Sequence, residues 1–256
     1  MQNIKFGNRW LSDFGGRLTE CLPREIAQRD YELVEIPGKD GADCIDKGCY
    51  KNVDMRRKIV LIGSDLEEKA ELLIRHFAYK QGYQPFEDTA HPGLTTQAVL
   101  INFPSVINEL RTLRTAELVF SRLPFWFLKS GLKEVSLNLS ELTVSGVKLH
   151  NPYPSEAKSV IRFKYTSGTS FSYVRLVING IEYRSAISAP VTFSSDTVLD
   201  YDIDKQHAVF RKTNGEIIGF LNIPISDPLS SGENTIIASF SESPVSVSII
   251  PHWRCL

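Results

Sequence analysis

The stretch from residue 64 to 82, SDLEEKAELLIRHFAYKQG, constrains the fold more than any other part of this sequence. Ser64 and Glu67 have the spacing of a capping box, and Gly82 can adopt the left-handed conformation that ends a helix. We therefore predict one long helix over about residues 65–81. Its apolar side chains would form a single stripe along that helix: Leu66, Ala70, Leu73, Ile74 and Phe77.

A helix with one apolar face is marginal alone, so it must pack on another element. Most of the sequence around it has the alternation of strands, and we expect the helix to cover one face of a sheet. A single helix between strands indicates an α+β arrangement rather than repeated βαβ units. Residues 41–52 show no clear pattern and are predicted to be a loop or an irregular arm. The predicted strands of this half are 4–6, 31–36, 57–62, 83–86, 98–103 and 116–120.

The composition changes near Gly131, where helix patterns stop and Ser, Thr and Gly become frequent. Asn179-Gly180 is a strong hairpin signal because both residues accept positive φ, and Asn214-Gly215 is a second one. Strands that recur every 8–12 residues or so with such turns indicate a β-sandwich. We predict two domains, 1–131 and 132–256. The predicted strands of the second are 135–139, 142–149, 159–165, 171–178, 181–187, 197–203, 208–210, 216–221, 235–240 and 245–250.

The overall charge excludes some partners. The formal net charge is −1, with no basic excess for binding nucleic acid or an anionic membrane. The first residues lack an apolar signal core. The longest apolar cluster, 123–128, is interrupted by Pro124 and is too short to cross a bilayer. We expect synthesis in a cytoplasm and no contact with membranes.

One acidic motif deserves a test as a metal site. Asp200, Asp202 and Asp204 begin like a calcium-binding loop. The sixth position is Lys205 where glycine is needed, and the twelfth is Arg211 where a bidentate glutamate belongs. Because apolar residues alternate with the aspartates, we predict a strand with one solvated face.

Cysteine and histidine patterns also give no site. No C-x-x-C, H-E-x-x-H, G-x-S-x-G or phosphate-loop motif is present. The thiols are expected to be separate, although four thiols brought together by folding stay an alternative, and His76 is expected to interact with the end of its helix. We predict no catalytic, cofactor-binding or metal-binding residue and no enzyme, while a triad assembled by folding would leave no local mark. The residues concerned are Cys21, Cys44, Cys49, Cys255, His76, His91, His150, His207 and His252.

Three consecutive aromatic residues, Phe125, Trp126 and Phe127, could form a stacking platform for a sugar or a partner. Apolar neighbours on both sides predict that at least two of them lie in the core.

Several segments together resemble the distal tail protein (Dit) family of long-tailed, siphovirus-type bacteriophages. The resemblance covers almost the whole chain, in the family's order and at its length. It rests on the ordered set rather than on any single motif. The segments are FGNRWLSDFG, VEIPGKDG, KIVLIGSDLEEKAELLIRHF, TAELVFSRLPFW, LHNPYPSEAKSVIRFKY, the hairpin around Asn179-Gly180, DYDIDKQHAVFRKTNGE, PLSSGENTI and PHWR.

The resemblance implies a mainly β chain: an N-terminal β-sandwich domain with one long helix and an extended arm, and a C-terminal galectin-like β-sandwich. It implies a virion protein of the tail tip that forms a hexameric ring, with phage DNA passing through. The implied neighbours are the tail tube protein, the tail-associated hub or fibre protein and, in some phages, receptor-binding proteins. No cofactor is implied. Residues 42–52 are the candidate for an arm that reaches a neighbouring copy.

Two other functions stay open from the residues alone. The first is a carbohydrate-binding β-sandwich module for recognition of host cell surfaces. The second is a hydrolase on a β scaffold, which would need polar groups with shifted pKa values in a cleft. The aromatic residues that motivate the carbohydrate module are Phe163, Tyr165, Phe171, Tyr173, Tyr183 and Tyr201.

Overall fold

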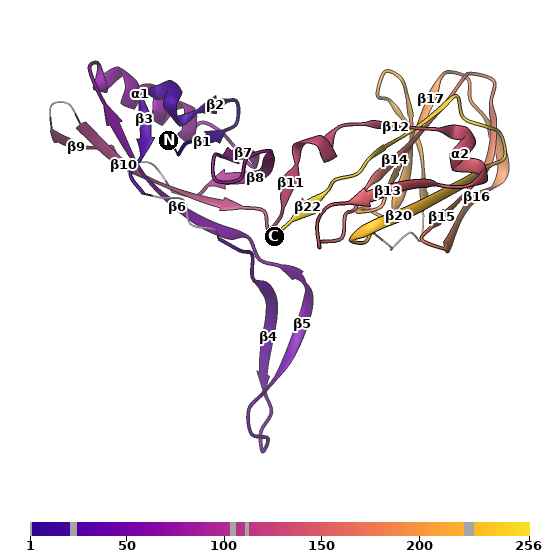
Figure 1. The fold of residues 1–256 in the computed structure, drawn as a ribbon, viewed down its shortest axis with the longest axis horizontal. Helices are drawn as coiled ribbons and strands as arrows, with labels where there is room; N and C mark the ends of the chain where they lie inside the picture. The colour runs from indigo at the N-terminus through magenta and orange to yellow at the C-terminus, as the bar shows by residue number, and fades with distance from the viewer. Residues whose placement is uncertain (1, 21–24, 103–105, 111–112, 223–227) are drawn as a thin grey trace. The chain divides into compact units, whose positions relative to one another are not determined.

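The computed structural model describes residues 2–20, 25–102, 106–110, 113–222 and 228–256. Within these ranges the chain is mostly strand, with two α-helices, which confirms the predicted mainly β class (Figure 1). The chain forms two compact units, one up to Trp126 together with Leu256 and one over Phe127–Cys255. That residues 1–131 and 132–256 are independently folding domains stays a prediction.

The first unit is built on one antiparallel sheet whose strands follow the order β2-β1-β7-β8-β10-β6-β3, with β9 beside β10. The longest pairing joins β6 and β10 over ten residues each, from Leu113 opposite Ile62 to Arg122 opposite Val53. A short 3-10 helix, Leu11–Phe14, links β2 to β3. The strands are β1 (Ile4–Phe6), β2 (Arg9–Trp10), β3 (Gly16–Leu18), β6 (Val53–Ile62), β7 (Gln84–Asp88), β8 (Leu94–Leu100), β9 (Val106–Leu110) and β10 (Leu113–Arg122).

Helix α1 (Leu66–Ala78) packs on this sheet through the apolar stripe that the sequence predicts. Phe77 stacks on Phe6 of β1, with ring centroids 5.4 Å apart, and also contacts Phe120 of β10. Aromatic pairs of this kind add stability beyond the apolar area that they bury. The helix residues buried in this core are Leu66, Ala70, Leu73 and Phe77.

The helix starts within one residue of its predicted start, but its predicted C-terminal end and its predicted capping box were wrong. It begins at Leu66 and ends at Ala78, and no side chain caps its first turn. The N-cap residue is Asp65, which has a φ of 59°, whereas a capping side chain needs the extended backbone of a usual N-cap. The capping box at Ser64 therefore does not form. Gly82 does have a positive φ of 67°, but it lies in the turn to β7 beyond the helix end.

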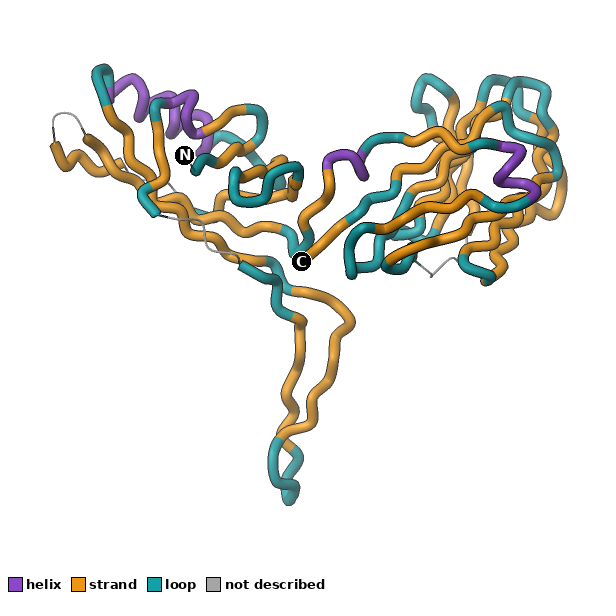
Figure 2. Tube along the Cα trace, viewed as in Figure 1, coloured by secondary structure: helices purple, strands orange, loops and turns teal. Residues whose placement is uncertain are grey.

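Residues 41–52 were predicted to be a loop or an irregular arm, and the loop was wrong. Most of them form strand β5 (Ala42–Tyr50), which pairs antiparallel with β4 (Arg29–Glu35). We call this hairpin, residues 29–50, the arm. Figure 2 shows it as a ribbon of two strands. Single-sequence alternation missed β5 because its charged and apolar residues do not separate onto two faces.

The second unit is a sandwich of two antiparallel sheets, as predicted. One sheet has the order β12-β21-β14-β17-β18-β19 and the other β13-β20-β15-β16, with the hydrophobic core between them. The short strand β11 (Trp126–Leu128) pairs with β22 (Arg254–Cys255) where the chain enters and leaves this unit. The other strands are β12 (Val135–Leu137), β13 (Val147–Asn151), β14 (Val160–Tyr165), β15 (Ser170–Ile178), β16 (Ile181–Thr192), β17 (Thr197–Asp202), β18 (His207–Lys212), β19 (Ile217–Asn222), β20 (Gly232–Phe240) and β21 (Ser246–Ile250).

A short helix interrupts the predicted strands of this unit, and here the sequence-based expectation of no helix was wrong. Helix α2 (Leu139–Val144) follows β12 and precedes β13. Asn138 caps it, because its Oδ1 accepts a hydrogen bond from the backbone N–H of Ser140. Leu142 is fully buried in the sandwich core. Six residues are too few to show a helical period, so only the packing of Leu142 reveals the helix.

Candidate interaction surfaces

The arm has no core of its own. Nearly all side chains of β4 and β5 are exposed, and ion pairs run along the ribbon. Exposed ion pairs contribute little to stability, and a lone two-stranded hairpin is marginally stable in water. The backbone ladder and these pairs hold the arm together: Arg29–Asp46, Lys39–Asp43, Lys47–Glu32 and Lys51–Asp30.

Asp46 organises the strand where the arm joins the first unit. Its carboxylate accepts hydrogen bonds from the backbone N–H of Gly48 and from the Arg29 guanidinium. These contacts, the Gly48 bond first, lower the pKa of Asp46. Arg29 also lies over the Tyr50 ring, 5.2 Å from its centroid. Gly48 has a φ of 74°, which suits the register shift that the pairing shows here.

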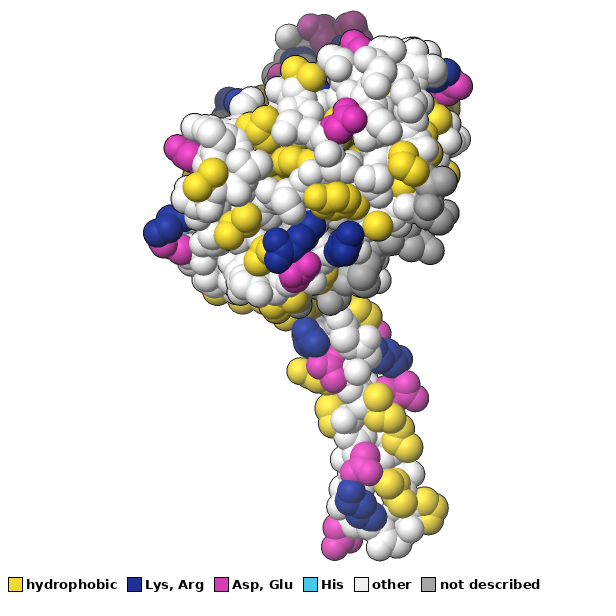
Figure 3. Space-filling view, turned by 90° about the vertical axis from the view of Figure 1, so that its right-hand side faces the viewer, with side chains coloured by type: hydrophobic (Ala, Val, Ile, Leu, Met, Phe, Trp, Pro, Cys, Tyr) yellow, Lys and Arg dark blue, Asp and Glu magenta, His cyan; other side chains and the backbone are white. Residues whose placement is uncertain are grey.

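Both faces of the arm carry exposed apolar side chains. Leu33 pairs with Cys44 on one face and is 70% exposed. Ile45 lies opposite Glu32 on the other face and is 51% exposed. Figure 3 shows hydrophobic side chains along the narrow ribbon at the bottom of the view. Clustered apolar exposure on a segment without a core marks a protein contact surface. The sequence alternation did not reveal it, because apolar residues occupy both faces: Tyr31, Leu33, Val34, Ile36 and Ile45.

The aspartate motif does not converge on a cation. Asp200 binds Arg162 at 2.6 Å, Asp202 accepts from the backbone N–H of Lys205, and Asp204 pairs with Lys158. The intervening Leu199, Tyr201 and Ile203 are buried. The predicted strand with one solvated face is confirmed for β17. Across the described residues, no group of three or more His, Cys, Asp or Glu side chains could hold a metal ion.

The cysteines whose placement is described do not form a site. Cys44 and Cys49 are exposed on β5, and Cys255 is half-buried at the end of the second unit. Cys21 lies outside the described residues, so the alternative of four gathered thiols is not tested with it. Cys44 and Cys49 carry free thiols.

The histidines that make hydrogen bonds bind groups close to them in the fold. His76 Nε2 lies 2.8 Å from the carbonyl oxygen of Phe6, so it bonds to the sheet beneath its helix. Burial lowers the pKa of His76. His91 bonds to Asp88 at 2.8 Å and stacks on Trp126. His207 and His252 bond to backbone carbonyls. These contacts give the four histidines structural roles in the fold.

The aromatic run has one core residue, whereas at least two were predicted. Trp126 is buried, with the Arg122 guanidinium 5.1 Å from its ring centroid. Phe125 is half-buried against Tyr50, and Phe127 is half-buried near His252. Strand alternation does not hold here, because the chain leaves one unit after Trp126 and enters the next. The run therefore offers no continuous stacking platform.

The aromatic residues that motivated a carbohydrate module lie inside the sandwich. Tyr173 is the exception: it is half-buried, and the Arg184 guanidinium lies 5.2 Å from its ring centroid. The buried members of the set are Phe163, Tyr165, Phe171, Tyr183 and Tyr201. A helix long and apolar enough to cross a membrane is not found in the part of the chain that the structure describes.

Solved structures match this chain, whereas comparisons of its sequence find no match. No family model and no curated protein matches its sequence. The crystal structure of the Dit protein of phage SPP1, described as a paradigm of the hub adsorption apparatus of phages that infect Gram-positive bacteria, matches over 97% of both chains, with a TM-score of 0.68 and 16% identity. The phage P2 baseplate in its activated conformation matches over 97% of both chains, with a TM-score of 0.48 and 10% identity. The resemblance predicted from the sequence is thus confirmed for the fold: the chain has the fold of a phage Dit protein over 97% of its length.

Proposed function

We propose that this protein is a structural hub of a bacteriophage tail tip, a distal tail protein that forms a hexameric ring. The ring joins the tail tube protein to the tail-associated hub or fibre protein and offers a base for receptor-binding proteins. Its place is the virion, after synthesis in the bacterial cytoplasm, and phage DNA passes through it. Its role is mechanical and needs no cofactor.

The observation that carries this proposal is the match of both units, in order and over 97% of each chain, to the SPP1 Dit structure. Agreement over one sandwich alone would be weak, because β-sandwiches serve many functions. Here the helix-covered sheet, the arm and the sandwich occur together in one chain. Similarity of fold does not show how copies would assemble, and the surface of the arm provides a physical reason for assembly.

The arm is suited to hold neighbouring copies together. It exposes apolar side chains on two faces, while its own stability is marginal. Burial of one such side chain contributes about 1.5–3 kcal/mol, which would stabilise both the contact and the hairpin. In a ring, each copy presents one patch to a different patch of the next copy. A projecting ribbon with two apolar faces fits such a head-to-tail contact. The net charge of −1 keeps repulsion between copies small.

The oligomer's mass and symmetry test the proposal. Mass photometry and negative-stain microscopy of the full chain should show rings of about six copies of the 28.8 kDa chain. A chain that stays monomeric at high concentration, with no ring in the images, would remove the proposed function.

A double variant, Leu33→Ser with Ile45→Ser, removes one apolar side chain from each face of the arm. We expect it to lose the ring while each unit keeps its fold, as measured by circular dichroism. The matched control is Val144→Ser, which changes a side chain that is 82% exposed on α2, outside the arm. Rings that survive the double variant would show that the arm does not hold the assembly.

The structure gives no support for a carbohydrate-binding module or for a hydrolase. The aromatic side chains expected to stack on sugar are in the core, apart from half-buried Tyr173. For hydrolysis, the largest pKa shifts belong to Tyr165 and Tyr201, two phenols inside the sandwich whose pKa values burial raises. Both hydroxyl oxygens are buried, so these pKa shifts are a consequence of packing.

A further inference from the structure

The two lateral sides of the sandwich are closed differently. On one side, β12 and β13 are the edge strands of the two sheets, and α2 connects them and inserts Leu142 into the core. On the other side, the edge strands are β16 and β19. No helix of the described residues covers that side, and an apolar hollow of about 190 Å³ opens there.

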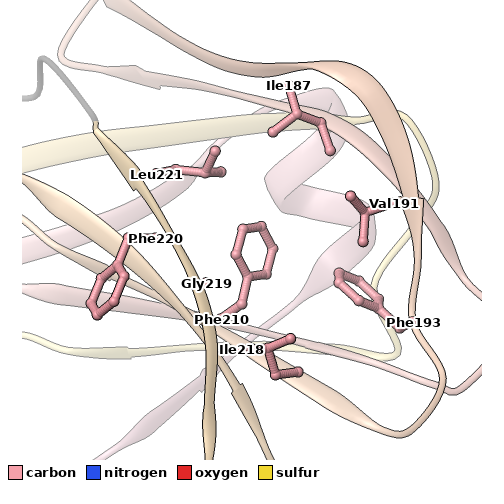
Figure 4. A pocket seen from close by; sticks show the side chains of 8 residues that line it. All are labelled: Ile187, Val191, Phe193, Phe210, Ile218, Gly219, Phe220 and Leu221. Carbon is pink, nitrogen blue, oxygen red and sulfur yellow. The ribbon is translucent and has the colours of Figure 1, made fainter.

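The hollow lies between the two edge strands. Phe193, just after β16, and Phe210 of β18 form its inner wall, and Ile218 of β19 lies at its rim, whereas the Phe220 side chain of β19 points away from the others (Figure 4). Both side chains of β19 are well exposed, Ile218 at 49% and Phe220 at 64%. The described lining has no charged side chain. A cavity of about 150 Å³ already admits a benzene-sized group, so the hollow is large enough for an apolar side chain.

Strand β19 has little of the usual protection of a sheet edge, apart from a register shift at residues 217–219. Its segment, IIGFLN, contains no charge and no proline, and its outer edge pairs with no described strand. Exposed edges are normally protected by charges, proline or strand irregularity. The edge strands of the other sheet carry charge or proline: β13 carries the Lys148–Glu233 ion pair, and β16 contains Pro190.

We propose that β19 and the hollow beside it bind an extended, uncharged segment of another protein by β-strand addition. The unpaired N–H and C=O groups of β19 would bind the backbone of that segment, which makes a polypeptide the fitting occupant. Alternate side chains of an added strand point to the same face, so one apolar side chain can enter the hollow. The absence of charge in the lining selects against acidic or basic segments, because burial of an unpaired charge is costly. This inference is independent of the ring proposed above.

The test uses the full-length protein and blocked, fluorescein-labelled eight-residue peptides in which threonine alternates with leucine, valine or phenylalanine. We expect at least one peptide to bind with 1:1 stoichiometry by fluorescence anisotropy, and a peptide of alternating threonine and glutamate to bind no better than background. Hydrogen exchange of the backbone amides in 217–221 should slow when the peptide is bound.

Variants on opposite edges of the same sheet make the test specific. Ile218→Lys places a charge at the hollow, whereas Val135→Lys places one at the exposed edge strand β12. We expect Ile218→Lys to weaken binding about tenfold or more, since edge lysines oppose strand addition, and Val135→Lys to leave it unchanged. Phe220→Lys provides a second variant if the first unfolds.

Three outcomes would overturn the inference. The first is that no apolar peptide binds with a dissociation constant below about 1 mM, the level of a contact worth about 4 kcal/mol. The second is equal weakening by Ile218→Lys and Val135→Lys. The third is self-association through this edge, seen as a dimer that Ile218→Lys returns to monomer, because the occupant would then be a second copy of this chain.

Discussion

Two hairpins of this protein, the arm and β15–β16, form by the same local rules and end in opposite surroundings. Both are antiparallel ribbons with a register shift. In β15, every buried side chain belongs to the sandwich core, among them Phe171, Val174 and Leu176. In the arm, apolar side chains lie on both faces and face solvent. Backbone pairing is thus enough to form a strand. Whether the strand adds to a hydrophobic core depends on having its apolar side chains on one face.

Hydrogen exchange should separate the two hairpins most strongly. At a concentration where the protein is monomeric, amides of β5 should exchange faster than the slowest amides of β15 by at least about three powers of ten. The physical reason is that β15 opens only when the sandwich unfolds. Mass spectrometry of exchanged peptides measures this, and similar protection in both hairpins would refute the comparison. In the assembled ring, the arm should gain protection.

Truncation of one leucine in each hairpin gives the next largest contrast. Leu176→Ala, at a fully buried position, should lower the free energy of unfolding by about 2–5 kcal/mol because it leaves a cavity. Leu33→Ala, at an exposed position, should change it by less than about 0.5 kcal/mol in the monomer. Urea titrations followed by tryptophan fluorescence measure both values. A large loss for Leu33→Ala would mean that the arm packs on something in the monomer.

The turns allow a backbone-only version of the same comparison. Gly180 and Gly38 have φ values of 87° and 84°, and an added Cβ would meet no atom within 4 Å at either site. Gly180→Ala should cost about 1–2 kcal/mol, since alanine disfavours positive φ and this hairpin unfolds with the sandwich. Gly38→Ala should leave global unfolding unchanged. Equal costs would show that the arm belongs to the same cooperative unit.

Lowering the pH should have the smallest effect on the stability of the protein. Because burial lowers the pKa of His76, the native state binds a proton less readily than the unfolded chain does. Its contribution to stability is therefore complete above the ordinary pKa of 6.5 and is lost as pH falls below that value. The variant His76→Leu should show a smaller fall in stability between pH 7 and pH 5. An unchanged slope would exclude His76 as the titrating group.

The arm responds in a different pH range. The pKa of Asp46 is lowered by its bond from Gly48, so its contribution is present above its ordinary value of 3.8 and is lost as pH falls below it. The chemical shift of the Gly48 amide reports this protonation. The variant Asp46→Asn should leave the free energy of global unfolding unchanged. This result would show that the charges of the arm do not contribute to the stability of the two units.

The parts of the fold that follow from local pattern could be predicted. The stripe from Leu66 to Phe77 identified α1, and Asn179-Gly180, with φ values of 51° and 87°, identified the β15–β16 turn. The capping of α1 could not be predicted, because Asp65 adopts a left-handed backbone that no neighbouring residue signals. Helix α2 was missed because its reason to exist, the burial of Leu142, lies in a contact distant in sequence. The apolar hollow could not be predicted either, since it joins β16 to β18 and β19.

By itself, the sequence determined which segments are extended, where one helix shows its apolar face, and that the ordered segments resemble a phage tail family. These properties depend on neighbours along the chain, through backbone preference and side-chain period. Only the tertiary structure decided that β5 is a paired strand, that α2 closes one side of the sandwich, and that β19 leaves the other side open. Those features depend on which edges and apolar surfaces meet in space, and a strand's pattern does not say what lies beside it.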